Sequence, residues 1–307
     1  MPKVSVITAC YNGEKYIAKA IESLQAQTFT DWEHIVIDDG STDASYQVIS
    51  SYLATEPRLR LFKQPNSGLC KTRNNGFKMS SPESEYLWFL DQDDLLDPTM
   101  LEVMINYLDI HHEAGMAYCD HWLINSEGKI IKQVKSVRYI PSRFGIEQLP
   151  YETANTPFLS IGFGCCIEPI CILRRSVYEK TSGWSDSLGQ GHEGIDLFLQ
   201  VALLGEVHFV PQNLYYYRRH AEQMTKKINW ETQVQKLIVK WKSETDFTAA
   251  QTKHYSQLAW FYENRYLPYL WVKEGRAMMR NKKYIKSIEL HLKAAKRYFM
   301  SFLSSAQ

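Results

Sequence analysis

The chain has 307 residues, of which 45% are hydrophobic and 22% are charged, as in an ordinary soluble globular protein that could form one large domain or a domain with an appendage. Its formal net charge of +1 hides an asymmetry, because residues 226–307 hold 16 basic and 6 acidic side chains, which leaves −9 on residues 1–225. No run of about 18 uninterrupted apolar residues is present, which excludes a membrane-spanning helix by this criterion.

The start of the chain and its cysteines indicate a cytosolic protein. A strand pattern begins at once, without the charged and apolar regions of a secretory signal. The six cysteines show no CxxC spacing, and the adjacent pair Cys165-Cys166 suits neither a disulfide framework nor a zinc site. We therefore expect reduced cysteines that pack in the interior.

Short apolar runs alternate with helical patterns from the start of the chain to Leu90. The expected strands are Val4–Ala9, His34–Ile37, Arg58–Phe62 and a run that ends at Leu90, and the expected helices are Lys15–Gln27, Ser45–Leu53 and Lys71–Lys78. This alternation predicts βαβ units and a parallel sheet. The loops after the strands, which are residues 9–12, 38–43, 66–68 and 91–94, should then meet at one edge, where α/β sheets bind ligands.

The run Tyr86–Leu90 leads straight into Asp91, Asp93 and Asp94, which places three carboxylates at the end of a strand buried on both faces. No basic residue lies nearby in the sequence, so the carboxylates would repel one another unless a cation joined them. Mg2+ and Mn2+ prefer oxygen ligands and hold diphosphates through one or two carboxylates. The alternative is an acidic loop that caps a helix starting at Asp97-Pro98.

Beyond Met100 the pattern changes. The expected elements are a hairpin of Met116–Asn125 with Lys129–Val137, a long loop region over 138–164, a helix over Glu193–Leu204, and strands over His208–Pro211 and Tyr215–Arg218. From Trp230 onward the pattern is helical and amphipathic. We therefore predict a domain over residues 1–225 and a helical C-terminal extension over 226–307.

Familiar nucleotide motifs are absent, since the chain has neither a GxxxxGK[ST] phosphate loop nor a GxGxxG after its first strand. Four other segments, VSVITACYNGEKYIAKAIESLQAQTF, IVIDDGSTDAS, NSGLCKTRNNG and FLDQDD, closely resemble the family 2 glycosyltransferases of the GT-A fold in order, spacing and strand placement. The resemblance covers about residues 3–220. It implies an α/β GT-A fold with a mainly parallel central sheet, to which the helical C-terminal appendage is added.

The resemblance also implies which residues bind the nucleotide-sugar: Thr8, Ala9, Tyr11, Asp38, Asp39, Lys71, Arg73, Asp91 and Gln92. In this family Tyr11 flanks the base, beside the backbone of Thr8 and Ala9, and the Asp38-Asp39 pair accepts a hydrogen bond from a uracil-like ring. Lys71 and Arg73 match the basic position near the base or phosphate. The alternatives are a plain Asp-Gly turn for the acidic pair and a solvated helix face for the basic residues.

For the metal, Mn2+ or Mg2+, the resemblance implies Asp93 as the direct ligand, with Asp91 nearer the ribose and Asp94 behind them. The segment Tyr215–His220 resembles the closing segment of the family, in which a histidine approaches the metal or the diphosphate. His220 is therefore a further candidate ligand, and a structural role for this histidine is the alternative.

The catalytic motif is where this chain departs from the family. The segment Gly191–Leu197 stands where the family has two adjacent acids, and Gly194 replaces the second of them, which often is the general base. Glu193 and Asp196 remain, three residues apart and so on one helix face. We expect Glu193 to be the base and Asp196 its orienting partner or substitute, whereas simple capping of the helix by Glu193 is the alternative.

The function implied is inverting, metal-dependent transfer of a sugar from a nucleotide diphosphate-sugar, a UDP-sugar above all, to a hydroxyl of a glycan or lipid-linked acceptor. No nucleic-acid partner is expected. Because of Gly194, a nucleotide-sugar-binding subunit that has lost turnover and acts as a partner or scaffold is the alternative. Nucleotidyl transfer ranks last, because the chain lacks a Gly-rich N-terminal loop with Arg and Lys.

The basic C-terminal extension is expected to meet an anionic surface, at the inner face of a membrane that bears a lipid-linked acceptor. Its aromatic residues suit a membrane interface: Trp230, Trp241, Trp260, Phe261, Tyr262, Tyr266, Tyr269 and Trp271. Aromatics at helical spacing also form cores, so packing or homo-oligomer contact through 226–307 is the alternative.

Overall fold

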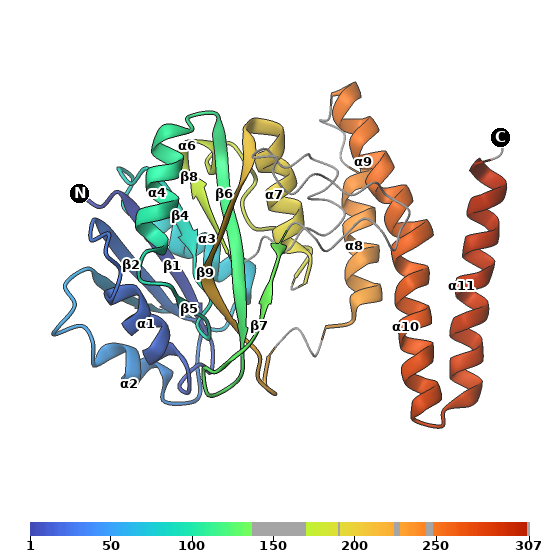
Figure 1. Ribbon diagram of the computed structural model, residues 1–307, viewed down its shortest axis with the longest axis horizontal. Helices are drawn as coiled ribbons and strands as arrows, with labels where there is room; N and C mark the ends of the chain where they lie inside the picture. The colour runs from blue at the N-terminus through green and yellow to red at the C-terminus, as the bar shows by residue number, and fades with distance from the viewer. Residues whose placement is uncertain (137–169, 190, 224–227, 244–247, 306–307) are drawn as a thin grey trace. The chain divides into compact units, whose positions relative to one another are not determined.

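The computed structural model describes residues 1–136, 170–189, 191–223, 228–243 and 248–305. The chain divides into two compact units, Met1–Lys226 and Lys227–Gln307, each of which is described by itself (Figure 1). The expected loop region over 138–164 and the cysteines at 165 and 166 lie outside the described residues. The other four cysteines, Cys10, Cys70, Cys119 and Cys171, are buried and form no disulfide with one another.

The first unit is built on one nine-stranded sheet, in the order β3-β2-β1-β4-β8-β6-β9-β5 with β7 paired to β6. The strands are β1 Val4–Cys10, β2 Trp32–Asp38, β3 Leu59–Lys63, β4 Tyr86–Phe89, β5 Leu95–Leu96, β6 Ala114–Ile124, β7 Ile130–Val134, β8 Cys171–Arg174 and β9 Glu206–Arg218. β1 to β4 run parallel, as does the β6–β9 pair, whereas β8 is antiparallel to both β4 and β6. The expected mainly parallel α/β sheet is confirmed.

The helices of this unit are α1 Ile17–Gln25, α2 Ser45–Ser50, α3 Leu69–Met79, α4 Met100–Ile110, α6 Arg175–Tyr178 and α7 Glu193–Leu204. α4 begins after Thr99 rather than at Asp97-Pro98, and Asp97 Oδ1 accepts hydrogen bonds from Thr99 N at 3.0 Å and from Thr99 Oγ1 at 2.7 Å just before the helix. The two strands expected over 208–218 are wrong as separate elements. They form one strand, β9, which stays paired with β6 through irregularities in register near Asp120.

β4 lies at the centre of the sheet and is buried on both faces. Each of its four residues, Tyr86 to Phe89, is at most 3% exposed. Residues of β1, β4, α4 and β6 form one continuous core around Trp88. This burial explains the unbroken apolar run in the sequence, because a strand covered on both faces has no polar side.

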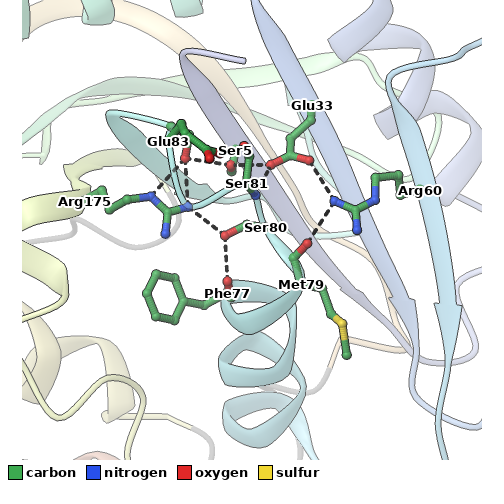
Figure 2. Close-up of polar contacts among 10 residues, drawn as sticks. Ser5, Glu33, Arg60, Phe77, Met79, Ser80, Ser81, Glu83 and Arg175 are labelled. Atoms are coloured by element: carbon green, nitrogen blue, oxygen red, sulfur yellow. Dashed lines mark hydrogen bonds and ion pairs between the residues drawn. The ribbon is translucent and has the colours of Figure 1, made fainter. Parts of the chain in front are cut away.

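A buried polar network fastens the N-terminal ends of the strands (Figure 2). Glu33 accepts hydrogen bonds from Ser5 Oγ at 2.7 Å and from Arg60 Nη1 at 3.1 Å. Arg175 donates to Ser80 Oγ at 2.7 Å and to Ser84 Oγ at 2.8 Å, and Ser84 Oγ lies 2.8 Å from Ser5 Oγ. Two buried charges are thus satisfied, as burial of ionised groups requires.

The second unit is helical. It consists of α8 Trp230–Ser243, α9 Ala249–Phe261, a π-helical turn Tyr262–Tyr266, α10 Leu267–Arg280 and α11 Tyr284–Ser305. α10 and α11 lie side by side as a helical hairpin (Figure 1), joined at Lys282, which has a left-handed φ of 60°. No helix in the described ranges is long and apolar enough to span a bilayer.

Several aromatics expected at a membrane interface instead form the core of this unit. Trp241, Phe261, Tyr262 and Trp271 are each at most 6% exposed, and the Trp241 ring packs 5.6 Å from the Tyr262 ring. For these four residues the membrane-interface expectation is wrong, because their side chains are buried: the Phe261 ring also lies 5.6 Å from the Tyr262 ring, and Lys293 Nζ lies 4.2 Å from the Trp271 ring.

Candidate active site

The loops that follow β1, β2 and β4 are joined to one another by hydrogen bonds at the C-terminal edge of the sheet. Asp39 N donates to Cys10 O at 2.7 Å, and Asn12 N donates to Ser41 Oγ at 3.0 Å. Gln92 joins the loop after β4 to the loop after β1, since its Oε1 accepts a hydrogen bond from Tyr11 N at 2.9 Å and its Nε2 donates one to Tyr11 O at 3.1 Å. The loops therefore meet at the edge where the sequence places them.

Tyr11 offers an aromatic surface at this edge, with 43% of the residue exposed. Its backbone is held by Gln92, whose amide lies close to Gly13: a Cβ on Gly13 would lie 2.3 Å from Gln92 Oε1 and would displace this side chain. Gln92 thus orients the Tyr11 loop. The Thr8 side chain is buried and lies 3.0 Å from His34 Nε2, so only its backbone could face a ligand.

The acidic pair after β2 is buried. Asp39 accepts from Gln64 Nε2 at 2.7 Å, Ser67 N at 2.8 Å and Gly68 N at 3.0 Å, so it shapes the loop before α3. Asp38 Oδ1 accepts from Ser41 N at 3.2 Å. Asp38 Oδ2 is buried and makes no hydrogen bond among the described residues, and it lies 4.0 Å from Lys63 Nζ at the end of β3.

The three acids after β4 gather into a carboxylate cluster, with one oxygen each from Asp91, Asp93 and Asp94 within 4.8 Å of one another. Asp94 is buried and accepts from Tyr215 Oη and from Arg218 N, both at 2.7 Å. Burial and the negative charges of Asp93 and Asp91 raise the pKa of Asp94 well above its usual range.

Two basic side chains contact the carboxylate cluster. Arg73 Nη2 lies 2.8 Å from Asp91 Oδ1, and its guanidinium stacks 4.1 Å from the Trp184 ring. His220 Nε2 lies 2.8 Å from Asp93 Oδ2, and its ring packs 4.6 Å from that of Tyr16. The structure therefore brings His220 to the carboxylate cluster. Arg73 contacts the same cluster through Asp91, whereas the sequence predicts that Arg73 lies near the base or the phosphate of the donor.

Lys71 is not brought into the cluster. It is exposed on the first turn of α3, and its ammonium has no polar partner in the part of the chain that the structure describes. Both the donor-binding role and the solvated-face alternative are compatible with this position.

The carboxylate cluster suits a hard divalent cation. Its donors are all oxygens, the chemistry that Mg2+ and Mn2+ prefer. Asp94 is engaged internally, whereas the side chains of Asp91 and Asp93 are 31% and 20% exposed and so can be reached by a ligand. The pKa of Asp94 is raised by its burial and by the charges of Asp93 and Asp91, so ionising all three carboxylates together is unfavourable. A bound cation would offset their repulsion.

Glu193 and Asp196 lie in the first turn of α7, and both are buried. Glu193 accepts a hydrogen bond from Gly191 N, and Asp196 accepts from Gln200 Nε2 at 3.1 Å. The loop before α7 is fastened to α3, because Cys70 Sγ donates to Gly189 O at 3.3 Å. The start of α7 is thereby tied to the helix that carries Arg73.

Arg218 and Tyr16 are two residues that sequence reasoning missed. Arg218 Nε donates to Asp93 O at 2.7 Å, Nη1 donates to Ser126 O at 3.0 Å, and the guanidinium lies 5.0 Å from the Tyr16 ring. The only signal for Arg218 was its place in the Tyr215–His220 string. Nothing in the sequence links Tyr16 to a segment about two hundred residues away.

Comparisons with known proteins agree on one family. The profile described as glycosyl transferase family 2 matches residues 5–182. An uncharacterized glycosyltransferase of Haemophilus influenzae is 33% identical over 145 residues, which are 46% of this chain and 56% of that protein. The chain thus matches little more than half the length of this curated relative.

Solved structures share the fold. TarS of S. aureus, determined in complex with UDP-GlcNAc, is 19% identical and matches 97% of this chain and 81% of its own with a TM-score of 0.69. A mannosyltransferase of Pyrobaculum calidifontis, determined with GDP-Man and Mn2+, is 13% identical and matches 97% and 87% of the two chains with a TM-score of 0.55.

Proposed function

The chain belongs to glycosyl transferase family 2, and from this premise we propose that it transfers a sugar from a UDP-sugar to a hydroxyl of a glycan or lipid-linked acceptor, with inversion at the sugar. The observation that carries the proposal is the carboxylate cluster, which lies at the end of a central strand beside the exposed ring of Tyr11. Similarity to proteins solved with UDP-GlcNAc and with GDP-Man supports a nucleotide diphosphate-sugar as the donor.

In this proposal the base of the donor stacks on Tyr11, and Asp38 Oδ2, which makes no hydrogen bond among the described residues, accepts one from the base. Asp91 and Asp93 hold a divalent cation, Mn2+ or Mg2+, which when bound neutralises charge on the diphosphate. Arg73 keeps Asp91 in place, and His220 does the same for Asp93. These contacts preorganise the cluster before the donor arrives.

Glu193 acts as the general base. It takes the proton from the acceptor hydroxyl while the acceptor oxygen attacks the anomeric carbon, and the bond between that carbon and the diphosphate oxygen breaks on the opposite face. The diphosphate leaves with the electron pair, so one displacement inverts the configuration. Asp196, one helical turn along, orients Glu193 or replaces it.

Calorimetry of UDP binding tests the donor site. With Mn2+ present, UDP should bind the chain, and Asp93→Asn should weaken it at least about tenfold, since even groups one step removed from a metal change affinity by 10–100-fold. Asp109→Asn, a matched acid-to-amide change on α4 where Asp109 pairs with Lys3, is the control. Equal UDP affinity in EDTA, or an unaffected Asp93→Asn, would remove the metal from the proposal.

A second candidate function is a nucleotide-sugar-binding subunit without activity, and Gly194 in the catalytic motif favours it. A measurement of turnover distinguishes this subunit from a transferase. A chain that binds UDP with Mn2+ but releases none from a panel of UDP-sugars with glycan and lipid-linked acceptors would be such a subunit. Release of UDP that depends on the acceptor would establish the transferase.

We further propose that the second unit meets the anionic inner face of a membrane, which would bring the chain to a lipid-linked acceptor. On α11, Ile285, Ile288 and Leu292 are 78%, 56% and 65% exposed, and their spacing of three and four places them on one face. Five exposed lysines lie on α11 and in the turn before it: Lys282, Lys283, Lys286, Lys293 and Lys296. An apolar face with adjacent lysines is typical of helices that lie in a membrane interface.

Cosedimentation with vesicles tests this docking. Binding should be stronger to anionic than to neutral vesicles, should fall with added salt, and should be lost in Ile285→Glu/Leu292→Glu. Val239→Glu, at an equally exposed site on α8, is the control. Salt-insensitive or absent vesicle binding, together with a change of oligomeric state in the double variant, would instead assign this face to a homo-oligomer contact.

A further inference from the structure

A second group of metal-ligand side chains lies at the other edge of the sheet. His111 follows α4, Glu113 precedes β6, and Glu206 and His208 stand at the start of β9. β4 and β6 point the same way, since both are antiparallel to β8. The carboxylate cluster follows the end of β4, so these residues at the start of β6 and β9 occupy the opposite edge.

The four side chains already contact one another in pairs. His111 Nδ1 lies 3.0 Å from Glu113 Oε1, and His208 Nε2 lies 2.8 Å from Glu206 Oε2. The two imidazole rings are 5.3 Å apart. One ligand atom each from His111, Glu113 and His208 lies within 4.8 Å of the others, so small rotations of surface side chains would bring them around one ion.

We propose that His111, Glu113, Glu206 and His208 form a binding site for a transition-metal ion of the zinc type. Zinc is usually four-coordinate and accepts imidazole nitrogen and carboxylate oxygen, and these residues supply two of each. The side chains of Glu113 and Glu206 are 51% and 44% exposed and are free to turn toward an ion, whereas that of His208 is 3% exposed and fixed.

The surroundings of the group match those of a metal site. A histidine that binds a metal through one nitrogen generally gives the other N–H to an oxygen. Tyr107 Oη lies 3.0 Å from His208 Nδ1, on the far side of the ring from Glu206, and the Tyr107 ring packs 4.2 Å from that of His111. Tyr107 thus holds both imidazoles.

The backbone between α4 and β6 is also fixed. Arg174 donates to Leu108 O at 2.8 Å and His111 O at 3.2 Å through Nη2, and to Ala114 O at 3.0 Å through Nε. These bonds brace the chain on both sides of His111 and Glu113. The backbone positions of two ligands are therefore set before any ion binds, which lowers the entropic cost of binding.

The test measures Zn2+ binding to the full chain by calorimetry without nucleotide, with Co2+ absorption as a signature of tetrahedral coordination. Asp93→Asn serves as the background, so that the carboxylate cluster does not contribute. One Zn2+ should bind, and His111→Ala or Glu113→Gln should weaken it at least about tenfold. His112→Ala removes the exposed neighbouring histidine and should change nothing.

Two results would overturn the site. One is the absence of stoichiometric Zn2+ binding in the Asp93→Asn background. The other is binding that survives the His111→Ala/Glu113→Gln double variant or that His112→Ala weakens as much as His111→Ala does. Tyr107→Phe gives an independent readout, because it leaves all four ligands and should still lower the affinity for Zn2+.

Discussion

Asp91 and Asp93 each have a basic partner, and this pairing decides what the carboxylate cluster offers a ligand. The Arg73 guanidinium offsets one of the three negative charges through Asp91. His220 contacts Asp93, and Asp94 is buried behind both with a raised pKa. A divalent cation would balance the charge that remains, and a nucleotide diphosphate could then approach without repulsion.

The choice between Glu193 and Asp196 is decided by a pair of variants. Glu193→Gln should keep UDP binding and lose about 10²-fold or more in turnover, the usual scale for removal of a general base. The matched control is Glu22→Gln, the same acid-to-amide change at an exposed site on α1 where Glu22 pairs with Lys19. An active Glu193→Gln beside an inactive Asp196→Asn would make Asp196 the base.

At the scale of elements, α3 and β1 approach each other closely at Gly76. A Cβ there would lie 2.3 Å from Ile7 Cγ2, in the fully buried core of β1. The glycine is thus required by packing, although glycine within a helix costs about 1 kcal/mol relative to alanine. The contact fixes the height of α3, and with it the position of Arg73, above the sheet.

Gly76→Ala should therefore destabilise the protein, because overpacking a core costs about 1–3 kcal/mol and outweighs the gain in helix propensity. Urea unfolding measures the change in the free energy of unfolding. Lys78→Ala, an exposed site two residues along the same helix, should stay within about 0.5 kcal/mol of the parent. A Gly76→Ala variant with a higher free energy of unfolding than the parent would show that α3 can move away from β1 at little cost in free energy.

Elements with a strong periodic signal could be predicted from the sequence. The helix over Glu193–Leu204, the hairpin around Gly128 and the order of the first four strands are as expected. The sequence does not predict β5, because two residues are too few to show a periodic pattern. It predicts two strands in place of β9, because an irregularity in register cannot be recognised without the partner strand. In the candidate site, local motifs predict which residues lie at this edge of the sheet, whereas partners such as Tyr16 and Arg218 depend on contacts between distant segments.

At the scale of the molecule, buried histidines link stability to pH. Burial lowers the pKa of His34 to about 3 and those of His121 and His192 to about 4. These groups stay neutral in the folded chain but take up protons near pH 6.5 when unfolded. The unfolded state then binds more protons, so stability is complete above pH 6.5 and is lost as the pH falls toward 4.

When the pH is lowered from 7.5 to 5.5, each of these histidines should reduce the free energy of unfolding by about 1.4 kcal/mol. Urea unfolding at both pH values measures this change. His34→Gln should reduce the pH dependence, whereas His112→Ala, at an exposed site, should leave it unchanged. A stability that is flat over this range would mean that protons reach these rings without unfolding.

The central place of β4 has a consequence for synthesis on the ribosome. One edge of this strand pairs with β1, which is made earlier, but the other pairs with β8, which begins only at Cys171. At about 5–20 residues per second, the nascent chain carries an unpaired edge of Tyr86, Leu87 and Trp88 for roughly 4–16 s. Unpaired apolar edges recruit other strands. A central strand of the finished sheet therefore depends on a partner that is made much later, and it is open to wrong pairing until that partner emerges.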